Sequence, residues 1–345
     1  MQHNKWLLIL PVIAIVAASG CTMPSWLGGG GTTTGIGNGV TILDFAPDFP
    51  SVQSGDYVQL QVRAQNMGEV KAYNVKAELT GIDVSQWGGT FGYGFVTSDF
   101  GDMLPYDKET NTPGSIKTKQ WRLTAPPQPK GINQNYQPIV KLSYDYKTSA
   151  QKMITIVDEA ELRRILQNGG SLPGQTATYS SGTLTVTITT GAYEKTAAEQ
   201  FNYDNLFPIQ IKITRTGSGS VVPPGTGTGL YGGAYTSIFG DAMNYPVGIR
   251  ITPPAGTSFR SLGGGWSGVD DCSTGTITKE MWKGQELDLT CELSVDTRPA
   301  YKEDRPLLVD VYYRYQTEAT TNLMVYGKDS SFSGGGWSGG WGYTW

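Results

Sequence analysis

The sequence contains few of the side chains that enzymes most often use for proton transfer or metal binding. Its single histidine, His3, lies in an N-terminal segment that is expected to be removed, so the mature chain is expected to contain no histidine. The commonest general base and the commonest zinc ligand would then be missing. Ser-His-Asp and Cys-His mechanisms are excluded in their usual form, and the three cysteines provide no two-cysteine zinc pair.

Carboxylates are the remaining candidates for chemistry. Four aspartates lie in glycine-rich or aromatic segments: Asp99, Asp102, Asp270 and Asp271. Two carboxylates can flank a glycosidic bond, and several can bind calcium. Aspartate is also a favoured turn residue, and neither pair has the ligand spacing of an EF-hand loop. The favoured interpretation is solvated turn carboxylates, with no catalytic residue, no metal and no cofactor.

Aromatic residues in glycine-rich stretches are candidates for binding. Those singled out are Trp87, Phe91, Tyr93, Trp266, Trp337, Trp341 and Trp345. Exposed rings on loops can stack on sugar faces or pack into a neighbouring subunit. The equally weighted alternative is that Trp87 and Trp266 close the open ends of their own domains. The tail has no obvious core to join, so docking on a partner, on a sibling copy or on the second domain all stay open.

The N-terminus has the layout of a secretory signal. Lys5 supplies positive charge, an apolar stretch follows from Trp6 to Ala18, and small residues precede Cys21. The apolar run is short for a membrane span, which needs about 20 residues. Cleavage is the favoured interpretation, and an uncleaved anchor reaching Leu27 is the alternative. In both, the rest of the chain is expected to be exported and to face the extracellular side of the cytoplasmic membrane.

The tetrapeptide Ala18-Ser19-Gly20-Cys21 resembles the lipobox of bacterial and archaeal lipoproteins. In those proteins the cysteine becomes the lipid-bearing first residue of the mature chain. Ala18 departs from the usual Leu at the first position of the motif. The resemblance implies lipid attachment at Cys21, and the alternative is a chance cysteine beside an ordinary cleavage site.

The other two cysteines, Cys272 and Cys291, form an even pair in the same predicted domain. For an exported chain this predicts a disulfide. The net charge of −4 and the pI near 5.2 argue against binding of nucleic acid, because nucleic-acid-binding proteins usually present a basic face.

The elements that must position these residues are predicted to be β-strands. Val58, Leu60 and Val62 alternate with polar residues, which is typical of a strand with one buried face. A second strand is predicted over 73–79, antiparallel to the first in the same sheet, after a turn at Asn66-Met67-Gly68. Further strands are predicted at 116–123, 139–146, 153–157, 207–213, 247–251 and 282–292.

One helix is predicted, from Asp158 to Gln167. Asp158 can cap its first turn, with Glu161 three residues on, and Gly169-Gly170 ends it. Because strands are predicted on both sides, the helix is expected to join two domains.

An internal repeat supports two domains of one type. Tyr144-Asp145-Tyr146-Lys147-Thr148-Ser149-Ala150 matches Tyr313-Arg314-Tyr315-Gln316-Thr317-Glu318-Ala319 at a constant offset of 169 residues. The predicted fold is all-β, with two tandem Ig-like β-sandwiches joined by a short helix. The ranges are 1–21 for the signal or anchor, 22–39 for a Gly/Thr-rich tether, 40–157 for the first sandwich, 158–178 for the helical linker, 179–329 for the second sandwich and 330–345 for a Gly/aromatic tail.

The segment from Pro50 to Leu79 resembles the Ig-like modules of archaeal S-layer-associated envelope proteins and the related CARDB-type adhesion domains. The resemblance rests on a Gly-Asp pair before a strand, an Asn-x-Gly turn after it, and the Ala72-Tyr73-Asn74-Val75 strand that follows. It covers the second domain only loosely, because Arg215-Thr216-Gly217 stands where the turn would be. The resemblance implies an Ig-like sandwich on an envelope surface, with no activity or ligand attached.

These observations predict a non-catalytic, membrane-anchored envelope protein that acts in structure, adhesion or assembly. The expected partners are the membrane through the N-terminus, envelope proteins or surface glycans, and a sibling copy. The alternative is a cell-surface polysaccharide-binding protein that uses the loop aromatics.

Overall fold

A computed structural model describes residues 39–83, 85–88, 97–170, 176–180, 182–190, 206–223, 244–260, 270–297 and 299–328, which all fall within one unit, Ile36–Trp345. These residues form β-sheets and one α-helix, so the predicted all-β class is confirmed.

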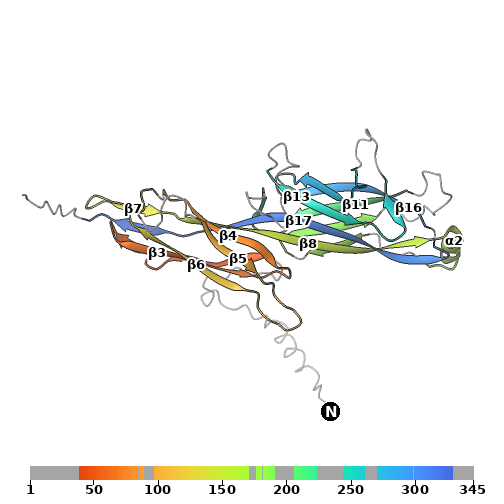
Figure 1. The fold of residues 1–345 in the computed structure, drawn as a ribbon, viewed down its shortest axis with the longest axis horizontal. Helices are drawn as coiled ribbons and strands as arrows, with labels where there is room; N and C mark the ends of the chain where they lie inside the picture. Colours follow the sequence, from red (N-terminus) through yellow and green to blue (C-terminus); the bar gives the residue numbers. More distant parts are fainter. Residues whose placement is uncertain are drawn as a thin grey trace, which may run out of the picture. The chain divides into compact units, whose positions relative to one another are not determined.

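The strands form four sheets (Figure 1). A three-stranded sheet has the order β1 (Val40–Pro47), β3 (Tyr57–Asn66), β6 (Ile116–Thr124). A five-stranded sheet has the order β14 (Thr257–Phe259), β16 (Glu286–Val295), β11 (Leu206–Arg215), β10 (Leu184–Thr190), β9 (Thr176–Ser180). A small sheet contains β2 (Ser51–Gln53), β18 (Leu323–Tyr326) and β7 (Asn133–Tyr136).

The fourth and largest sheet is built around two long strands, β8 (Ile139–Val157) and β17 (Lys302–Thr320). Its order is β15 (Thr276–Glu280), β13 (Pro246–Thr252), β17, β8, β4 (Ala72–Thr80), β5 (Thr97–Met103), with β12 (Ser220–Val222) also paired to β17. The two long strands are antiparallel and pair without a register shift from Lys302↔Val157 to Thr320↔Ile139. We call this pair the β8–β17 ribbon.

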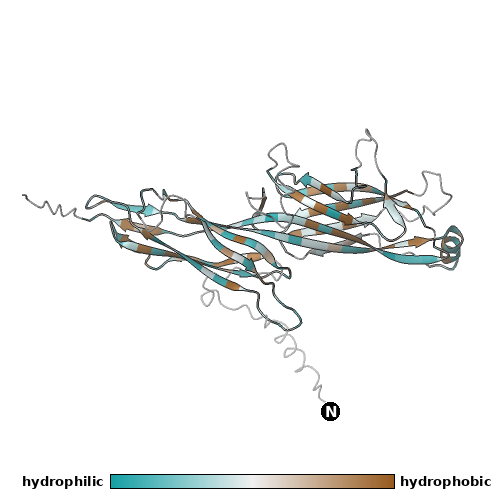
Figure 2. Ribbon diagram, in the orientation of Figure 1, coloured by the Kyte–Doolittle hydropathy of each residue, from teal (hydrophilic) through white to brown (hydrophobic). Residues whose placement is uncertain are grey.

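One face of the ribbon is buried along its length. The inward positions are every second residue, from Val140 to Ile156 on β8 and from Leu307 to Tyr315 on β17. β1 lies against both long strands, and β9 and β10 lie against β8. Figure 2 shows hydrophobic and hydrophilic residues alternating along many strands, as expected for sheets with one covered face. The three-stranded and five-stranded sheets therefore pack on the buried face of the ribbon.

The strands predicted around Val58, Leu60 and Val62 and over 73–79 are present as β3 and β4, but the prediction that they are neighbours in one sheet is wrong. β3 pairs with β1 and β6, whereas β4 pairs with β8 and β5. The buried Asn66 holds the crossing between the sheets. Its Nδ2 donates to the carbonyls of Val70 at 2.9 Å and Met103 at 3.1 Å, and its Oδ1 accepts from Gly68 N–H at 3.1 Å. The predicted turn is thus a crossing between layers.

The strands predicted separately at 139–146 and 153–157 are one strand, β8. Residues 139–145 pair with β4 on one side, and residues 139–157 pair with β17 on the other. Strand pairing therefore joins the range predicted as the first sandwich, 40–157, to the range predicted as the second, 179–329. The residues between the two predicted strands alternate as well, with Thr148, Ala150 and Lys152 buried, and small or polar side chains at those positions concealed the pattern in the sequence.

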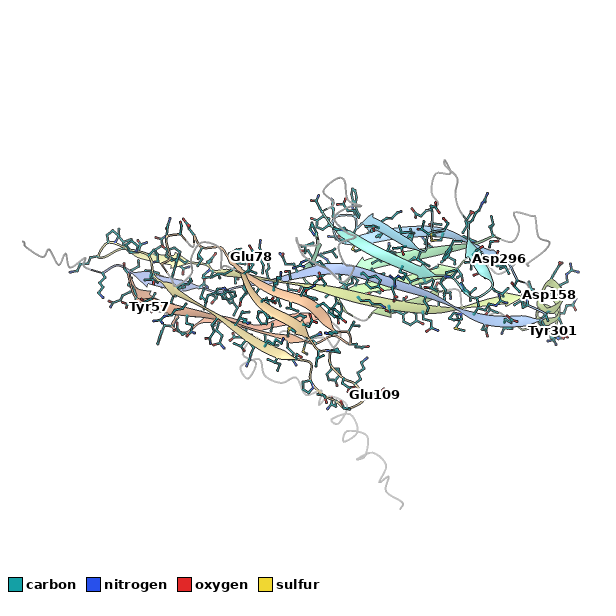
Figure 3. The ribbon with its side chains drawn as sticks, in the orientation of Figure 1. Tyr57, Glu78, Glu109, Asp158, Asp296 and Tyr301 are labelled. Atoms are coloured by element: carbon teal, nitrogen blue, oxygen red, sulfur yellow. A yellow bond between two sulfur atoms is a disulfide. The ribbon has the colours of Figure 1, made fainter. Side chains whose placement is uncertain are left out.

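The predicted helix is α2 (Glu159–Gln167), and its predicted cap is confirmed. Asp158 Oδ2 accepts from Ala160 N–H at 3.0 Å, and Gly169, at φ 71°, ends the helix. Asp158 N–H also donates to the carbonyl of Tyr301 at 2.8 Å, so α2 begins where β8 ends and β17 starts (Figure 3). Along the chain the helix lies between β8 and β9, and β9 pairs with β10 in the five-stranded sheet.

The two copies of the repeat face each other in the ribbon. Tyr146 is paired with Tyr313, and Tyr144 with Tyr315. All four rings are buried, with neighbouring ring centroids 5.7 to 6.3 Å apart. The Tyr313 hydroxyl contacts the hydroxyls of Thr148 at 3.0 Å and Thr183 at 3.1 Å. The repeat thus forms the aromatic centre of the core.

Burial raises the pKa of each of these four tyrosines, to about 12 for Tyr313 and Tyr315 and further for Tyr144 and Tyr146. Unfolded tyrosines ionise near pH 10, so between about pH 10 and 12 the folded state binds more protons than the unfolded state. Stability is therefore complete below about pH 10 and falls as pH rises, by about 1.4 kcal/mol per pH unit for each buried tyrosine.

This predicts steep alkaline unfolding, measurable as a falling urea midpoint from pH 9 to 11.5 alongside tyrosinate absorbance. Tyr144→Phe should flatten the slope, because it removes one of the buried hydroxyls whose raised pKa makes stability depend on pH. A midpoint that is constant up to pH 11.5 would contradict the prediction.

Candidate functional site

The carboxylates on β5 have separate partners. Asp99 Oδ1 accepts from Gly101 N–H at 2.6 Å, which closes a tight turn within the strand. Asp102 Oδ2 lies 2.9 Å from Lys71 Nζ, and this ammonium holds the pKa of Asp102 below its usual range. One carboxylate is thus bound to a backbone N–H of its own turn, and the other to an ammonium group.

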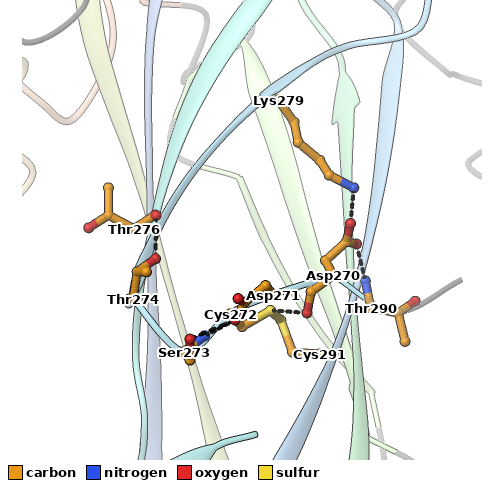
Figure 4. Close-up of a disulfide and its surroundings, with 9 residues drawn as sticks. All are labelled: Asp270, Asp271, Cys272, Ser273, Thr274, Thr276, Lys279, Thr290 and Cys291. Atoms are coloured by element: carbon orange, nitrogen blue, oxygen red, sulfur yellow. Dashed lines mark hydrogen bonds and ion pairs between the residues drawn. A yellow bond between two sulfur atoms is a disulfide. The ribbon is translucent and has the colours of Figure 1, made fainter. Parts of the chain in front are cut away.

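The aspartates beside the disulfide are occupied in the same way (Figure 4). The Asp270 carboxylate accepts from Lys279 and, at 3.0 Å, from Thr290 N–H, which ties the segment before β15 to β16. Asp271 Oδ1 accepts from the N–H and hydroxyl of Ser273 at 3.0 and 2.6 Å, and the hydroxyl bond lowers its pKa. Across the described residues, no group of three or more potential metal-ligating side chains comes together. The interpretation of these four residues as turn carboxylates fits this geometry.

The predicted disulfide between Cys272 and Cys291 is present, with the two Cα atoms 5.8 Å apart. Both cysteines are buried. Cys291 lies on β16 and Cys272 in the segment before β15, so the bond joins the five-stranded sheet to the edge of the large sheet. It is a covalent link between two layers of the core.

Trp87 is buried. Only 2% of it is exposed, and its ring packs edge-on against Tyr136 at 5.0 Å. Of the two roles considered for Trp87, this geometry fits closure of its own core and leaves no ring face for a ligand. Cys21, Phe91, Tyr93, Trp266, Trp337, Trp341 and Trp345 lie outside the described residues.

Exposed aromatic rings that sequence reasoning missed lie on separate elements. Tyr57, at the start of β3, is 60% exposed and carries the Arg122 guanidinium 4.2 Å from its ring centre. Trp282 and Tyr301 are also exposed, after β15 and before β17 respectively. Each of these rings lies at or next to the end of a strand. The surrounding segments are not rich in glycine or aromatic residues, so no sequence pattern distinguished them.

A hollow of about 630 Å³ lies at the 104–115 loop beside Glu69. Asp107 organises this loop, because its Oδ1 accepts from Glu109 N–H at 2.9 Å and its Oδ2 from the Thr110 hydroxyl at 2.7 Å. Lys108 forms an ion pair with Glu69. Two of the charged side chains that line the hollow thus pair with each other, and Asp107 is bound within its own loop.

An enclosed ion pair in the described part of the chain joins Asp145 and Arg314, whose side chains are 9% and 14% exposed. Arg314 Nη1 lies 3.3 Å from Asp145 Oδ1, and Arg314 Nη2 donates to Ser143 Oγ at 2.9 Å. Asn74 Nδ2 donates to the other Asp145 oxygen at 2.8 Å. The signal for this pair was present in the sequence, because the two residues occupy the same position of the repeat, but their contact depends on the antiparallel register.

No family model matches the chain, and no curated protein matches it.

Removal of the disulfide tests the role of the covalent link. A Cys272→Ser/Cys291→Ser chain should lose about 3 kcal/mol of stability, because the bond closes a loop of 19 residues. Urea unfolding followed by circular dichroism measures this loss, and the reduced wild-type chain should match the double variant. Equal urea midpoints for the oxidised and reduced chains would contradict the prediction.

Proposed function

We propose that this chain is a non-catalytic, membrane-anchored component of a cell envelope that acts in structure, adhesion or assembly. One observation carries the proposal: two long strands pair over 19 residues each and form the centre of the largest sheet, with β4 beside β8 and β13 beside β17. A continuous ladder of backbone hydrogen bonds resists the hinge motion that separate domains on a linker would have. Such a body suits spacing or assembly.

The chemistry of the described residues supports the same proposal. The four candidate aspartates are bound in turns or single ion pairs, and the strongest pKa shifts belong to tyrosines inside the core. Active sites are usually places where perturbed groups meet in a cleft. Here the perturbed groups support packing.

The finer parts of the proposal rest on the sequence. The strands are assigned to two Ig-like sandwiches like those of S-layer-associated proteins, the exported chain faces the extracellular side, and its partners are envelope proteins, surface glycans or a sibling copy. Anchoring is assigned to the N-terminal segment with lipid on Cys21. Within the described part of the chain, no helix is long and apolar enough to cross a membrane.

Membrane attachment is tested with Cys21→Ser. The wild-type chain should sediment with membranes and have the mass of residues 21–345 plus lipid, whereas the variant should lose the lipid and move toward the soluble fraction, because the lipid supplies the apolar anchor. Salt-washed membrane fractions and intact mass measure both. The Cys272→Ser/Cys291→Ser chain is the matched control and should stay with the membrane.

Two results would contradict parts of this proposal in different ways. A wild-type chain that stays in the membrane at full-length mass, without lipid, would show an uncleaved anchor and no lipidation. A wild-type chain found entirely in the soluble fraction would exclude membrane anchoring.

A further inference from the structure

The β8–β17 ribbon has a local two-fold symmetry that relates the two copies of the repeat. Its register runs from Val157↔Lys302 to Ile139↔Thr320, and the same register resumes between β7 and β18, from Tyr136↔Leu323 to Asn133↔Tyr326. Asp145 is the middle residue of the segment 133–157, and Arg314 is the middle residue of the segment 302–326 with which it pairs. The two residues are also opposite each other and 169 positions apart, as repeat mates are. A two-fold axis therefore passes between them.

The rest of the large sheet obeys this symmetry. Its order, β5-β4-β8-β17-β13-β15, is the same from both ends when β4 is matched to β13 and β5 to β15. The registers agree as well: Thr80 pairs with Ile139, and Thr252 pairs with Leu308, which is the repeat mate of Ile139. The three-stranded order β1-β3-β6 likewise matches β10-β11-β16 in the five-stranded sheet.

Each repeat completes its core with a strand of the other. β1 of the first repeat lies against β17, and its counterpart β10 of the second repeat lies against β8. This is the topology of an intertwined dimer, with one chain supplying both partners. The same strand edges could also pair between two copies of the chain, because backbone hydrogen bonds do not distinguish intrachain from interchain partners.

Most side chains in the centre of the ribbon do not specify which repeat is the partner. If two first repeats paired about the same axis, Tyr144 would face Tyr146, and if two second repeats paired, Tyr313 would face Tyr315. Tyrosine would face tyrosine in every combination. The residues on the axis behave differently, because Asp145 would face a second Asp145, or Arg314 a second Arg314.

We propose that the Asp145–Arg314 pair determines which repeats associate: it selects a first repeat with a second repeat and disfavours pairing of like repeats from two copies of this chain. Like charges directly opposite each other destabilise a strand pair, and a largely buried charge without its counterion is strongly unfavourable. Asn74 and Ser143 donate or accept hydrogen bonds here but carry no charge to replace the missing partner. This selection is independent of the proposed envelope role.

The test uses two full-length chains in the Cys21→Ser background with the Cys272–Cys291 bond intact. Arg314→Asp makes both axial positions of one chain acidic, and Asp145→Arg makes both positions of the other basic. Each alone should lose about 100-fold or more in its folding equilibrium constant, because its intrachain ribbon opposes like charges. Refolded together, the two chains should exchange repeats, since every axial contact between them is then acidic to basic.

Exchange is read from a disulfide between chains. Gln151 and Leu308 are directly paired on the exposed face of the ribbon, so Gln151→Cys is placed in the acidic chain and Leu308→Cys in the basic chain. Disulfide-linked dimer should be at least about 10-fold more abundant than with the same cysteines in chains that keep the natural residues at 145 and 314. Met153→Cys in place of Gln151→Cys is two positions out of register and should give no dimer.

The doubly exchanged chain, Asp145→Arg/Arg314→Asp, separates partner selection from a simple loss of stability. It should fold and elute as the wild-type monomer, because the opposite charges are restored within the chain. An equal yield of linked dimer with like-charge and natural axial residues would overturn the proposal. The proposal would also be overturned if the acidic and basic chains, refolded together, gave no linked dimer while the doubly exchanged chain folded normally.

Discussion

The structure depends on one uninterrupted ladder of backbone hydrogen bonds between β8 and β17. Every other sheet either extends this ladder or packs on its buried face, and the small sheet of β2, β18 and β7 continues its register beyond a short break. In an antiparallel pair a slip of one residue would turn the buried side chains outward. The register of the ribbon therefore decides the burial of both halves of the chain at once.

The tyrosines explain how loops distant in sequence are held over the ribbon. Their rings fill the core, while their hydroxyls reach the backbone of the crossings. Val70 N–H donates to the Tyr146 hydroxyl at 3.3 Å, and a Cβ on Gly68 would lie 1.9 Å from the same oxygen. At Gly217 a Cβ would lie 2.5 Å from the Tyr315 hydroxyl. Glycine is required at these positions because a large polar ring tip occupies the space of a side chain.

Much of the local structure was predictable from the sequence, because alternation and capping are short-range. The β3 strand, the Asp158 cap and the cysteine pair are examples. The long-range pairing was not predictable from the same signals. An Asn-x-Gly segment reads as a turn between neighbouring strands, yet Asn66 carries the chain from one sheet to another through bonds to Met103, 37 residues away. The repeat indicated a duplicated unit. Whether its two copies form separate domains or pair with each other depends on long-range strand pairing, which a single sequence does not reveal.

A duplicated chain with interlocked halves has a freedom that a symmetric assembly lacks. When two identical subunits meet on an axis, each residue there faces itself, so an acid can only face an acid. Once both partners are encoded in one gene, the two sides of the axis can mutate separately. Thr148 and Thr183 both serve Tyr313, whereas the equivalent Tyr144 hydroxyl has no such pair of partners among the described residues. A contact on a two-fold axis within one chain can thus have two different sides, here an acid at position 145 and a base at position 314.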